Sequence, residues 1–459
     1  MKFPDNQIKF VQLRNSYPFF RYENYSYYVD DNAIYIEFSF DYSGKYKFKP
    51  HITIPLKGFY IKERLTPEHL DNIVFNIGMI ELVSYWKAGC APELIIEPHD
   101  LSIEQLSWWK KIYYNGLGEF FYVNGIKTSL DTFVHIIPSG KEKPKPIHIH
   151  QDNSIIVPIG GGKDSIVSLE LMKRAGMNTT PLIMNPRGAT ISTASEAGFS
   201  LDEIIVINRQ IYPQLIRLND AGFLNGHTPF SAMLAFYTIL AAILTGKRNI
   251  ALSNESSANE STIINTDINH QYSKSFEFER DFRNYVSSNI SRDINYYSFL
   301  RPLNELQIAS VFSGFKNYFG IFKSCNAGSK NDIWCGACPK CLFTYIILSP
   351  FIEETQLKNI WGKDLFTDPG LTEFFDQLTG TAEIKPFDCI GTIDEINAAL
   401  CETIRIRASS PLPLLLEHYK SQNMFLKYKN IPFSEMMNSM HPHFLDEKNL
   451  KIIKGILTL

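Results

Sequence analysis

The spacing of apolar residues in the first third of the chain predicts a small sheet followed by a helix. Apolar and polar side chains alternate, as on strands with one buried face, in three short segments: 33–40, 46–48 and 52–54. A helical pattern follows from Pro67 to Tyr85. The segment 138–149 is rich in Pro and Lys, which is typical of a linker or a surface crossing. We therefore predict an N-terminal α+β domain over residues 1–150.

The middle of the chain has a different pattern. Residues 154–159 form an apolar run of strand length, as expected for a strand buried on both faces of a parallel sheet. A helical pattern over 164–175 follows, and Gly176 is placed to end it. Further strands are predicted at 181–184, 203–207 and 249–253. The alternation of strands and helices predicts an α/β fold with a doubly wound parallel sheet over 151–345, and the rest, 346–459, is predicted to be helical.

The most apolar long stretch runs from Phe230 to Leu244. It is shorter than the roughly 20 residues that span a membrane and it contains polar side chains, so we predict a buried helix. Thr228 and Pro229 are placed to supply its cap and its first helical residue. The first residues of the chain lack the apolar run of a signal peptide. These features predict a soluble, cytoplasmic protein that has no membrane partner.

Composition excludes two further classes of protein. Apolar residues make up 44% of the 459 residues, which is too many for a disordered chain. The 45 basic residues nearly balance the 48 acidic ones, for a net charge of -3. A dedicated nucleic-acid-binding protein usually carries a basic excess, so nucleic acid is not the expected partner. The sequence carries no pattern that specifies an oligomeric state.

A glycine-rich loop lies between the predicted strand at 154–159 and the helix after it. Its residues are Gly160, Gly161, Gly162, Lys163, Asp164 and Ser165. Glycines let backbone N–H groups approach phosphate oxygens, and the N-terminus of a helix favours an anion. Lys163 can offer charge, Asp164 can hold a magnesium ion and Ser165 can donate to a phosphate oxygen. The spacing fits neither a Walker A loop nor a dinucleotide fingerprint, and a tight turn that needs glycine is the alternative.

The loop resembles the S-G-G-x-D-S signature of the PP-loop ATP pyrophosphatases. It matches five of the six positions, with Gly160 in place of the first Ser. The resemblance implies that ATP binds with its β,γ-pyrophosphate on the loop and is cleaved, with Mg²⁺, between the α- and β-phosphates. It also implies that the adenine lies near the end of the second strand, around Asn185. That residue suits the end of a strand equally well.

Four of the seven cysteines cluster with the spacing C-x9-C-x2-C-x2-C: Cys325, Cys335, Cys338 and Cys341. Four thiolates are a standard ligand set for structural zinc, so we predict a Zn²⁺ site, with Lys340 offsetting part of the thiolate charge. The spacing also resembles that of zinc-bearing PP-loop enzymes such as the deazaguanine nitrile synthases. An iron–sulfur cluster and uncoordinated thiols are the alternatives.

Several further segments carry a second resemblance: 85–88 (YWKA), 116–120 (GLGEF), 224–227 (LNGH), 253–255 (SNE), 269–275 (NHQYSKS), 300–303 (LRPL) and 385–389 (KPFDC). Together with the loop and the cysteines, they resemble one family, the UDP-N-acetylmuramoyl-L-alanyl-L-glutamate epimerases of peptidoglycan precursor synthesis. The resemblance spans about residues 85–389 and implies ATP- and Mg²⁺-dependent inversion of the terminal L-Glu of the UDP-N-acetylmuramoyl dipeptide. The expected intermediate is an acyl-adenylate, and the expected by-products are AMP and pyrophosphate.

Such a reaction needs groups that move protons. Adenylation removes the carboxylate charge that makes the α-proton hard to abstract, and the resulting enolate can be stabilised by fixed donors. His227 and His270 are candidates for proton transfer because imidazole titrates near neutral pH. Tyr272, Lys274 and Cys389 are alternatives. Each of these side chains also suits a purely structural role.

Two charged residues are candidates for substrate binding. Arg301 can hold a phosphate or a carboxylate through two parallel hydrogen bonds, and a surface ion pair is the alternative. Glu255, with Asn254 before it, follows a predicted parallel strand, where such sheets bind ligands. Helix capping is the alternative for both of these residues.

Two other functions fit parts of the sequence. One is a PP-loop enzyme that passes its adenylate to ammonia or sulfur in modified-base synthesis, which the cysteine cluster suits. A recognisable amidotransferase domain and a basic RNA-binding region are missing, however. The other is a zinc module that binds a partner without catalysis. The charge balance and the glycine loop argue against it.

Overall fold

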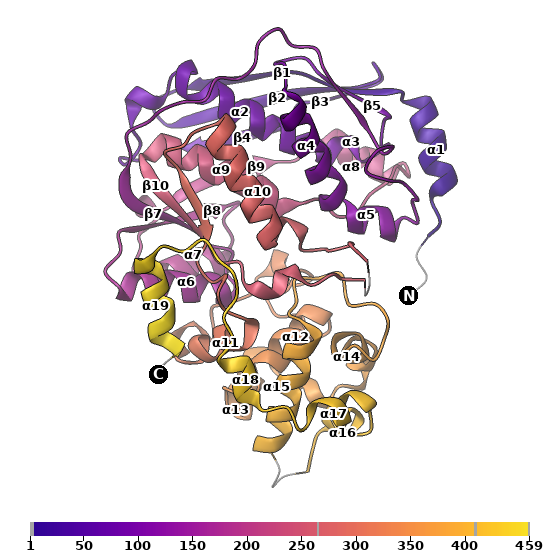
Figure 1. Ribbon diagram of the computed structural model, residues 1–459, viewed down its shortest axis with the longest axis vertical. Coiled ribbons are helices and arrows are strands. Elements are labelled where there is room, and N and C mark those ends of the chain that lie inside the picture. Colours follow the sequence, from indigo (N-terminus) through magenta and orange to yellow (C-terminus); the bar gives the residue numbers. More distant parts are fainter. Residues whose placement is uncertain (1–3, 264–265, 408–410, 458–459) are drawn as a thin grey trace. The chain divides into compact units, whose positions relative to one another are not determined.

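The computed structural model describes residues 4–263, 266–407 and 411–457 of the chain. The described chain is α/β, as predicted (Figure 1). It forms two compact units, and each combines three separate stretches of sequence. The first unit comprises Met1–Ile156, Ile205–Ile250 and Arg280–Asn295, and the second comprises Val157–Ile204, Ala251–Glu279 and Tyr296–Leu459. The consecutive boundaries at 150 and 345 and the doubly wound arrangement stay predictions.

The first unit contains a mixed sheet in the order β9-β4-β2-β1-β5-β6, with β3 paired to β2. Neighbours from β9 to β1 run antiparallel, whereas β1, β5 and β6 run parallel. Alternate residues of β2 are buried, and its Ile34 and Ile36 lie opposite Ile54 and Ile52 of β4. The three strands predicted from alternation are therefore confirmed. The strands are β1 (Phe19–Val29), β2 (Ala33–Tyr42), β3 (Tyr46–Phe48), β4 (His51–Pro55), β5 (Glu93–Ile96), β6 (His135–Pro138) and β9 (Ile205–Gln210).

Helices of the first unit surround one strongly apolar helix, α9 (Phe230–Thr245), which is buried as predicted and packs against α2 (Pro67–Glu81). The predicted start of α9 is wrong. Pro229 takes the N-cap position, and Thr228 binds the Lys87 side chain instead of capping the helix. The other helices are α1 (Gln7–Ser16), η1 (Lys62–Arg64), α3 (Val83–Trp86), α4 (Ile103–Gly116), α5 (Gly118–Val123) and α8 (Pro213–Asp220).

Four elements contribute residues to both units, because the division falls within them. They are β7 (Asp152–Pro158), β10 (Lys247–Leu252), α10 (Phe276–Asn289) and β11 (Asn295–Ser298). In the first unit β7 and β10 pair in parallel, with Ile155 opposite Asn249 and Ile156 opposite Ile250. The parallel pairing of two buried apolar strands is what their continuous apolar runs predict.

The second unit begins with the end of β7 and the glycine loop. The loop leads into α6 (Lys163–Arg174), which ends as predicted at Gly176, a glycine in the left-handed region with φ 67°. Then come β8 (Thr179–Met184), α7 (Gly188–Glu196) and η2 (Leu201–Glu203). The strand–loop–helix order that the glycine loop requires is therefore present.

The rest of the second unit is mainly helical, and the described residues from 346 onward are helical as predicted (orange to yellow in Figure 1). Helix α11 (Glu305–Ser313) packs against α6 and against α12 (Pro339–Leu348), and α12 packs against α15 (Ile393–Ile406). The other helices are η3 (Ser256–Asn259), η4 (Tyr272–Lys274), η5 (Lys316–Tyr318), η6 (Ser329–Asn331), α13 (Glu354–Trp361), η7 (Leu365–Thr367), η8 (Pro369–Leu371), α14 (Thr372–Thr379), α16 (Leu414–Lys420), α17 (Asn423–Tyr428), α18 (Phe433–Met437) and α19 (Glu447–Leu457).

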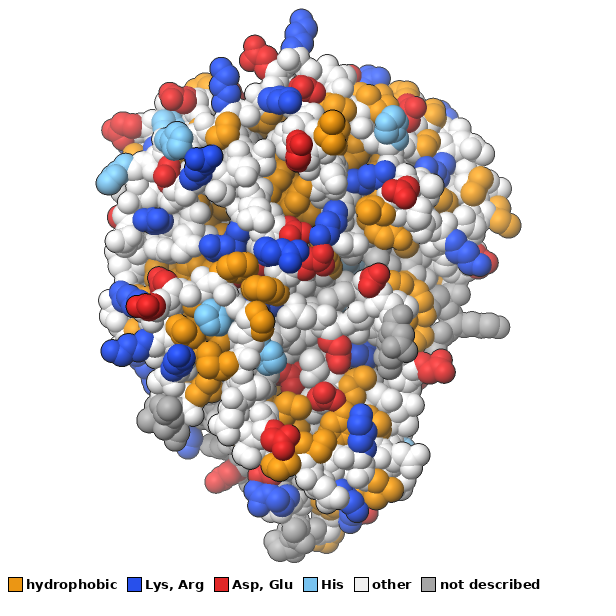
Figure 2. All heavy atoms as spheres, in the orientation of Figure 1, with side chains coloured by type: hydrophobic (Ala, Val, Ile, Leu, Met, Phe, Trp, Pro, Cys, Tyr) orange, Lys and Arg blue, Asp and Glu red, His pale blue; other side chains and the backbone are white. Residues whose placement is uncertain are grey.

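Two surface properties accompany this fold. Within the described ranges, no helix combines the length and the apolar character that crossing a membrane requires. On the face shown in Figure 2, Lys and Arg side chains are interspersed with Asp and Glu. That mixture agrees with the near-balance of charge in the sequence.

Candidate active site

The glycine loop combines one glycine that the backbone needs with another that it does not. Gly161 has φ 81°, and a Cβ there would lie 3.2 Å from Ala189 Cβ at the start of α7. Gly160 lacks a positive φ, and a Cβ there would meet no described atom within 4 Å. The geometry of the turn therefore requires glycine at position 161 only, because an L side chain at Gly160 would be neither strained nor crowded. Open space at Gly160 leaves its backbone accessible to a ligand.

Lys163, in the first turn of α6, connects two carboxylates. Its side chain is 5% exposed, and its Nζ binds the carboxylates of Asp164 and Glu305. Glu305 is the first residue of α11, and its N–H donates to Oε1 of Glu395 at 2.9 Å. Ser165 donates its hydroxyl to the Gly162 carbonyl at 3.0 Å. Phosphate contacts by Lys163 and Ser165 stay predictions.

Three carboxylates come together in the second unit. Asp164, Glu255 and Glu305 each present an oxygen within 4.8 Å of the other two. Burial and the two neighbouring carboxylates raise the pKa of Glu305 to about 7, against the opposing charge of Lys163. Burial and Asp164 also raise the pKa of Glu255. A compact set of carboxylate oxygens that disfavour one another's charge fits a hard divalent cation such as Mg²⁺.

Arg301 is completely buried and binds the segments that carry the site. Its guanidinium forms a salt bridge with Glu279 at 3.0 Å, and it donates to the backbone carbonyls of Glu255 and of Lys274, the latter at 2.5 Å. The surface ion pair considered above is therefore wrong, because the Arg301 side chain is 0% exposed. Contact with substrate would require this network to open, so the geometry assigns Arg301 a positioning role.

Lys274, at the end of η4, lies against a cysteine. Its Nζ donates to Cys389 Sγ at 3.2 Å, and Lys340 donates to the Cys389 carbonyl. Burial raises the pKa of the Cys389 thiol. The charge of Lys274 and then His270, which is also its hydrogen-bond partner, outweigh burial and lower the pKa to about 6. Cys389 is therefore mainly a thiolate at neutral pH, which is the form that can accept a proton.

Lys274 also links this thiolate to the carboxylates. Its positive charge acts on Cys389 and on Glu255 and Asp164, and these anions raise the pKa of the ammonium although burial lowers it. The Asp164 pKa falls for the same reason, since Lys163, Lys340 and Lys274 together outweigh burial. The nearby cations thus favour the ionised forms of Cys389 and Asp164, whereas the pKa values of Glu255 and Glu305 stay raised.

Other predicted side chains lie in the first unit around Lys87. This buried lysine donates to the carbonyls of Gly226 and His227, the latter at 3.1 Å, and to Thr228 Oγ1. Burial lowers its pKa to about 8. His227 Nδ1 lies 3.2 Å from a Glu119 carboxylate oxygen. Of the segments singled out above, 85–88, 116–120 and 224–227 belong to the first unit and the other four to the second.

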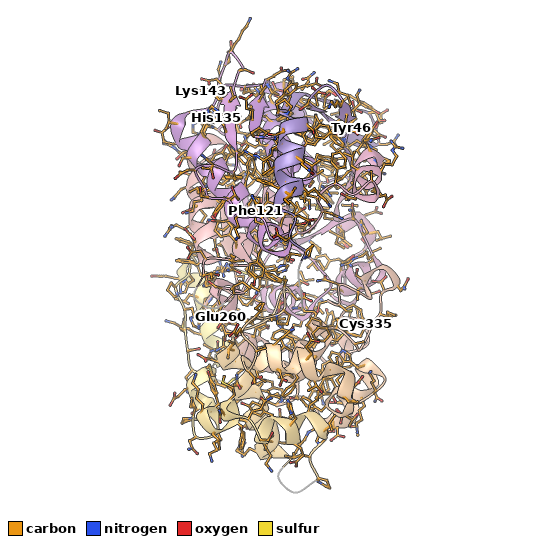
Figure 3. All side chains as sticks on the ribbon, turned by 90° about the vertical axis from the view of Figure 1, so that its right-hand side faces the viewer. Tyr46, Phe121, His135, Lys143, Glu260 and Cys335 are labelled. Atoms are coloured by element: carbon orange, nitrogen blue, oxygen red, sulfur yellow. The ribbon has the colours of Figure 1, made fainter. Side chains whose placement is uncertain are left out.

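Two other predicted residues lie in the second unit. Asn185 directly follows β8 and has φ 49°, a left-handed conformation that Asn tolerates, so it ends the strand. A role for Asn185 near adenine stays a prediction. Tyr272 is buried and its ring packs edge-on against Phe278. The four clustered cysteines also come together, with all Sγ atoms within 4.8 Å (Cys335 is labelled in Figure 3).

Comparison with known protein families decides the relationship of this chain. It matches the MurL N-terminal domain over residues 11–299 and the MurL C-terminal domain over residues 321–424. The chain belongs to the MurL family. The two matched ranges include every predicted site residue except Arg301.

Curated relatives are similar to this chain over most of their length. A UDP-N-acetyl-alpha-D-muramoyl-L-alanyl-L-glutamate epimerase of Xanthomonas oryzae pv. oryzae is 34% identical over 332 residues, covering 70% of this chain and 72% of the relative. Epimerases with the same name from Micromonospora sp. and Salinispora tropica are each 32% identical over 372 residues. These alignments cover 79% of this chain, and 82% and 80% of the relatives, respectively.

Sequence reasoning missed several residues of this MurL-family site. Glu305 and Glu279 sit in no recognisable motif, and only the fold brings them to Lys163 and Arg301. Lys340 was expected to offset thiolate charge in the cysteine cluster, but its ammonium binds the Cys389 carbonyl instead. For Lys340, the signal in the sequence was its position directly between two clustered cysteines.

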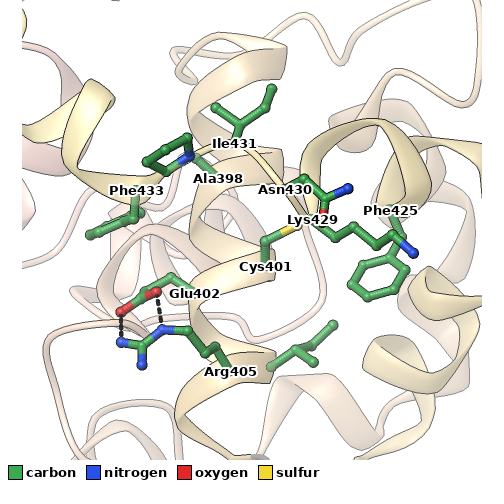
Figure 4. A pocket seen from close by; sticks show the side chains of 11 residues that line it. Ala398, Cys401, Glu402, Arg405, Phe425, Lys429, Asn430, Ile431 and Phe433 are labelled. Carbon is green, nitrogen blue, oxygen red and sulfur yellow. Dashed lines mark hydrogen bonds and ion pairs between the residues drawn. The ribbon is translucent and has the colours of Figure 1, made fainter.

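A cavity lies in the second unit, away from the predicted site residues. It measures about 530 Å³ and is lined by residues of α15, α17 and the segment before α18, including Cys401, Phe425 and Ile431 (Figure 4). An ion pair between Arg405 and Glu402 lies beside it. The predicted site residues do not line this cavity, so it supports none of the chemistry above.

Proposed function

We propose that this chain inverts the terminal L-Glu of UDP-N-acetylmuramoyl-L-alanyl-L-glutamate to D-Glu in peptidoglycan precursor synthesis. Membership of the MurL family and the names of its relatives support the substrate. The observation that carries the chemistry is the pairing of Cys389 with Lys274, 3.2 Å apart. An ionised thiol is a suitable base for an α-proton, because its pKa lies close to the working pH.

We further propose that ATP activates the Glu carboxylate as an acyl-adenylate, with AMP and pyrophosphate as by-products. The glycine loop at the start of α6 and the open backbone at Gly160 support phosphate binding there. Adenylation removes the negative charge of the carboxylate, which otherwise opposes formation of a carbanion at the neighbouring carbon. The α-proton of the neutral adenylate is therefore more acidic, which makes its removal by a thiolate easier.

Asp164, Glu255 and Glu305 are the residues that would hold Mg²⁺. Their oxygens lie within 4.8 Å of one another, and carboxylates are the ligands that Mg²⁺ prefers. The bound ion would supply positive charge beside the phosphates of ATP. Lys163 keeps Asp164 and Glu305 in place through its two salt bridges.

Cys389 is assigned one of the two proton transfers. Its thiolate removes the α-proton and becomes a thiol, or its thiol gives a proton to the α-carbon and becomes a thiolate, and His270, its hydrogen-bond partner, exchanges a proton with the sulfur to restore the starting form. Lys274 keeps Cys389 ionised between turnovers. The roles of His227 as a second proton carrier and of Arg301 as a substrate ligand stay predictions.

The test is to incubate the enzyme with the UDP-linked dipeptide, ATP and Mg²⁺ in deuterium oxide. We expect D-Glu, deuterium at the Glu α-carbon, and AMP with pyrophosphate. Free glutamate should be inert, because binding of the nucleotide-sugar positions the reacting carboxylate. Production of ADP and phosphate, or exchange without ATP, would contradict the mechanism. ATP cleavage without α-deuteration would favour the amide- or sulfur-transfer function instead.

A further inference from the structure

The four clustered cysteines form a compact set of sulfur atoms in the second unit. Cys325 Sγ lies 3.6 Å from Cys338 Sγ, and Cys335 Sγ lies 3.7 Å from Cys341 Sγ. All four sulfurs lie within 4.8 Å of one another. A tetrahedron with Zn–S bonds of about 2.3 Å has edges of about 3.8 Å. The sulfur positions are therefore those of ligands around one small ion.

We propose that Cys325, Cys335, Cys338 and Cys341 bind a single tetrahedral Zn²⁺ ion. Disulfides do not account for the arrangement, because an S–S bond is about 2.05 Å long and all four cysteines are free. A polynuclear iron–sulfur cluster would hold its thiolates farther apart, since several iron and sulfide atoms must fit between them. The closeness of all four sulfurs selects a mononuclear site.

Backbone N–H groups around the cluster support thiolate ligands. The N–H of Gly328 donates to Cys325 Sγ at 3.1 Å, and the N–H of Gly336 donates to Cys341 Sγ at 3.3 Å. Gly336 has φ 64°, and a Cβ at Gly328 would lie 2.1 Å from the Ile333 carbonyl oxygen. Both glycines are thus required by the turns that aim these donors at sulfur. Such outer hydrogen bonds orient ligands and stabilise their charge.

The proposed centre is attached to the candidate active site at both ends. Next to Cys325, the N–H of Lys323 donates to the Gly161 carbonyl in the glycine loop at 2.8 Å. Between Cys338 and Cys341, Lys340 donates to the Cys389 carbonyl. Asp332, in the loop from Cys325 to Cys335, accepts from the N–H groups of Gly188 and Ala189 at 2.8 and 3.0 Å. We infer that the ion holds the glycine loop and the Cys389 segment in position, an inference that rests on the proposed function.

The metal itself is tested by elemental analysis of the full chain purified without chelator. We expect about one zinc per chain, and a Co²⁺-substituted protein with the absorption spectrum of tetrahedral cobalt bound to thiolates. The Cys338→Ser variant should lose the metal, whereas Cys401→Ser, which changes a cysteine outside the cluster, should keep it. Absence of metal, or iron with inorganic sulfide, would overturn the proposal. Because Cys338→Ser can fail to fold, a second measurement removes and restores zinc in the wild-type protein and follows its Tm, which should fall and recover.

Coupling to the glycine loop needs its own measurement. ATP affinity is compared by calorimetry before and after zinc is removed by a zinc-selective chelator, with Mg²⁺ restored. We expect at least a tenfold loss of ATP affinity at a temperature where circular dichroism shows the fold is retained. Unchanged ATP affinity in folded, zinc-free protein would overturn the proposed coupling to the glycine loop, but it would not contradict the zinc site itself. Zinc binding without ATP binding in either form would instead count against the proposed function.

Discussion

Lys274 Nζ lies 3.2 Å from Cys389 Sγ, and Arg301 donates to the Lys274 carbonyl at 2.5 Å. The ammonium is therefore fixed beside the thiol by two independent contacts. Burial raises the pKa of Cys389, but the charge of Lys274, together with His270 and Lys340, lowers it to about 6. A reactive thiolate in a partly buried position is a strong indication of chemistry.

Replacing Cys389 with Ser should separate the two halves of the proposed reaction. We expect α-deuteration to fall by about 10²–10⁴-fold, the usual contribution of a general base. AMP formation from the dipeptide should continue, because the glycine loop is unchanged. The measurement is mass spectrometry of the product formed in deuterium oxide, with Cys401→Ser as the control. Full exchange in Cys389→Ser would exclude the thiolate as a base.

The pH dependence should report the same thiol. A base acts only when deprotonated, so the rate should fall as the pH drops below the Cys389 pKa of about 6. Lys274→Met removes the nearby positive charge, which should raise that pKa and move the acidic limb of kcat/KM toward higher pH. Lys274→Arg keeps the charge and should leave the limb near its original position. An identical profile in all three proteins would show that another group titrates.

Glu305→Gln should weaken the binding of Mg²⁺. The change removes one of three carboxylates, and we expect the apparent Mg²⁺ affinity to fall at least about tenfold. In the unaltered enzyme, affinity should weaken as the pH falls through about 7, where Glu305 takes up a proton and no longer binds cations well. Titration of activity with Mg²⁺ measures both effects. The exposed Glu373→Gln is the control, and equal behaviour of the two variants would place the ion elsewhere.

Gly160→Ala should lower the affinity for ATP, whereas Gly161→Ala should lower the stability of the protein. Alanine at Gly161 must adopt φ 81°, so we expect a loss of about 1–2 kcal/mol in the free energy of unfolding. Alanine at Gly160 meets no described atom, so stability should hold, while a methyl group facing bound phosphate should lower ATP affinity. Chemical denaturation and calorimetry measure the two quantities. Normal ATP affinity in Gly160→Ala would contradict close approach of phosphate at that residue.

Arg301→Met should be severely destabilising. The substitution leaves Glu279 buried without its partner, at a cost of about 3–5 kcal/mol in the free energy of unfolding. Arg405→Met removes an ion pair made by an exposed arginine with Glu402 and should destabilise the protein far less than Arg301→Met. Denaturant titration of both variants makes the comparison. Similar small effects would mean that Arg301 contributes little to the second unit.

Local pattern predicted the parts of the fold that depend on neighbouring residues. Alternation identified β2, and the glycine loop with Asp164 was recognisable because strand, turn and helix follow one another along the chain. Glu305 was missed because its role depends on meeting Lys163, which lies far away in the sequence. Arg301 was predicted to bind a ligand or to form a surface ion pair. The sequence does not reveal that the fold brings Glu279 and two backbone carbonyls to its guanidinium. Proximity in space, and not the type of residue, was the missing information.

The hydrogen bonds of Arg301 to Glu255 and Lys274 end on backbone oxygens. They fix where these two residues lie without depending on which side chains the residues carry. The framework and the reactive groups are thus separable, so Glu255 and Lys274 can be exchanged for other amino acids while the chain path through them persists. A relative with different side chains at these positions could carry out different chemistry on the same scaffold.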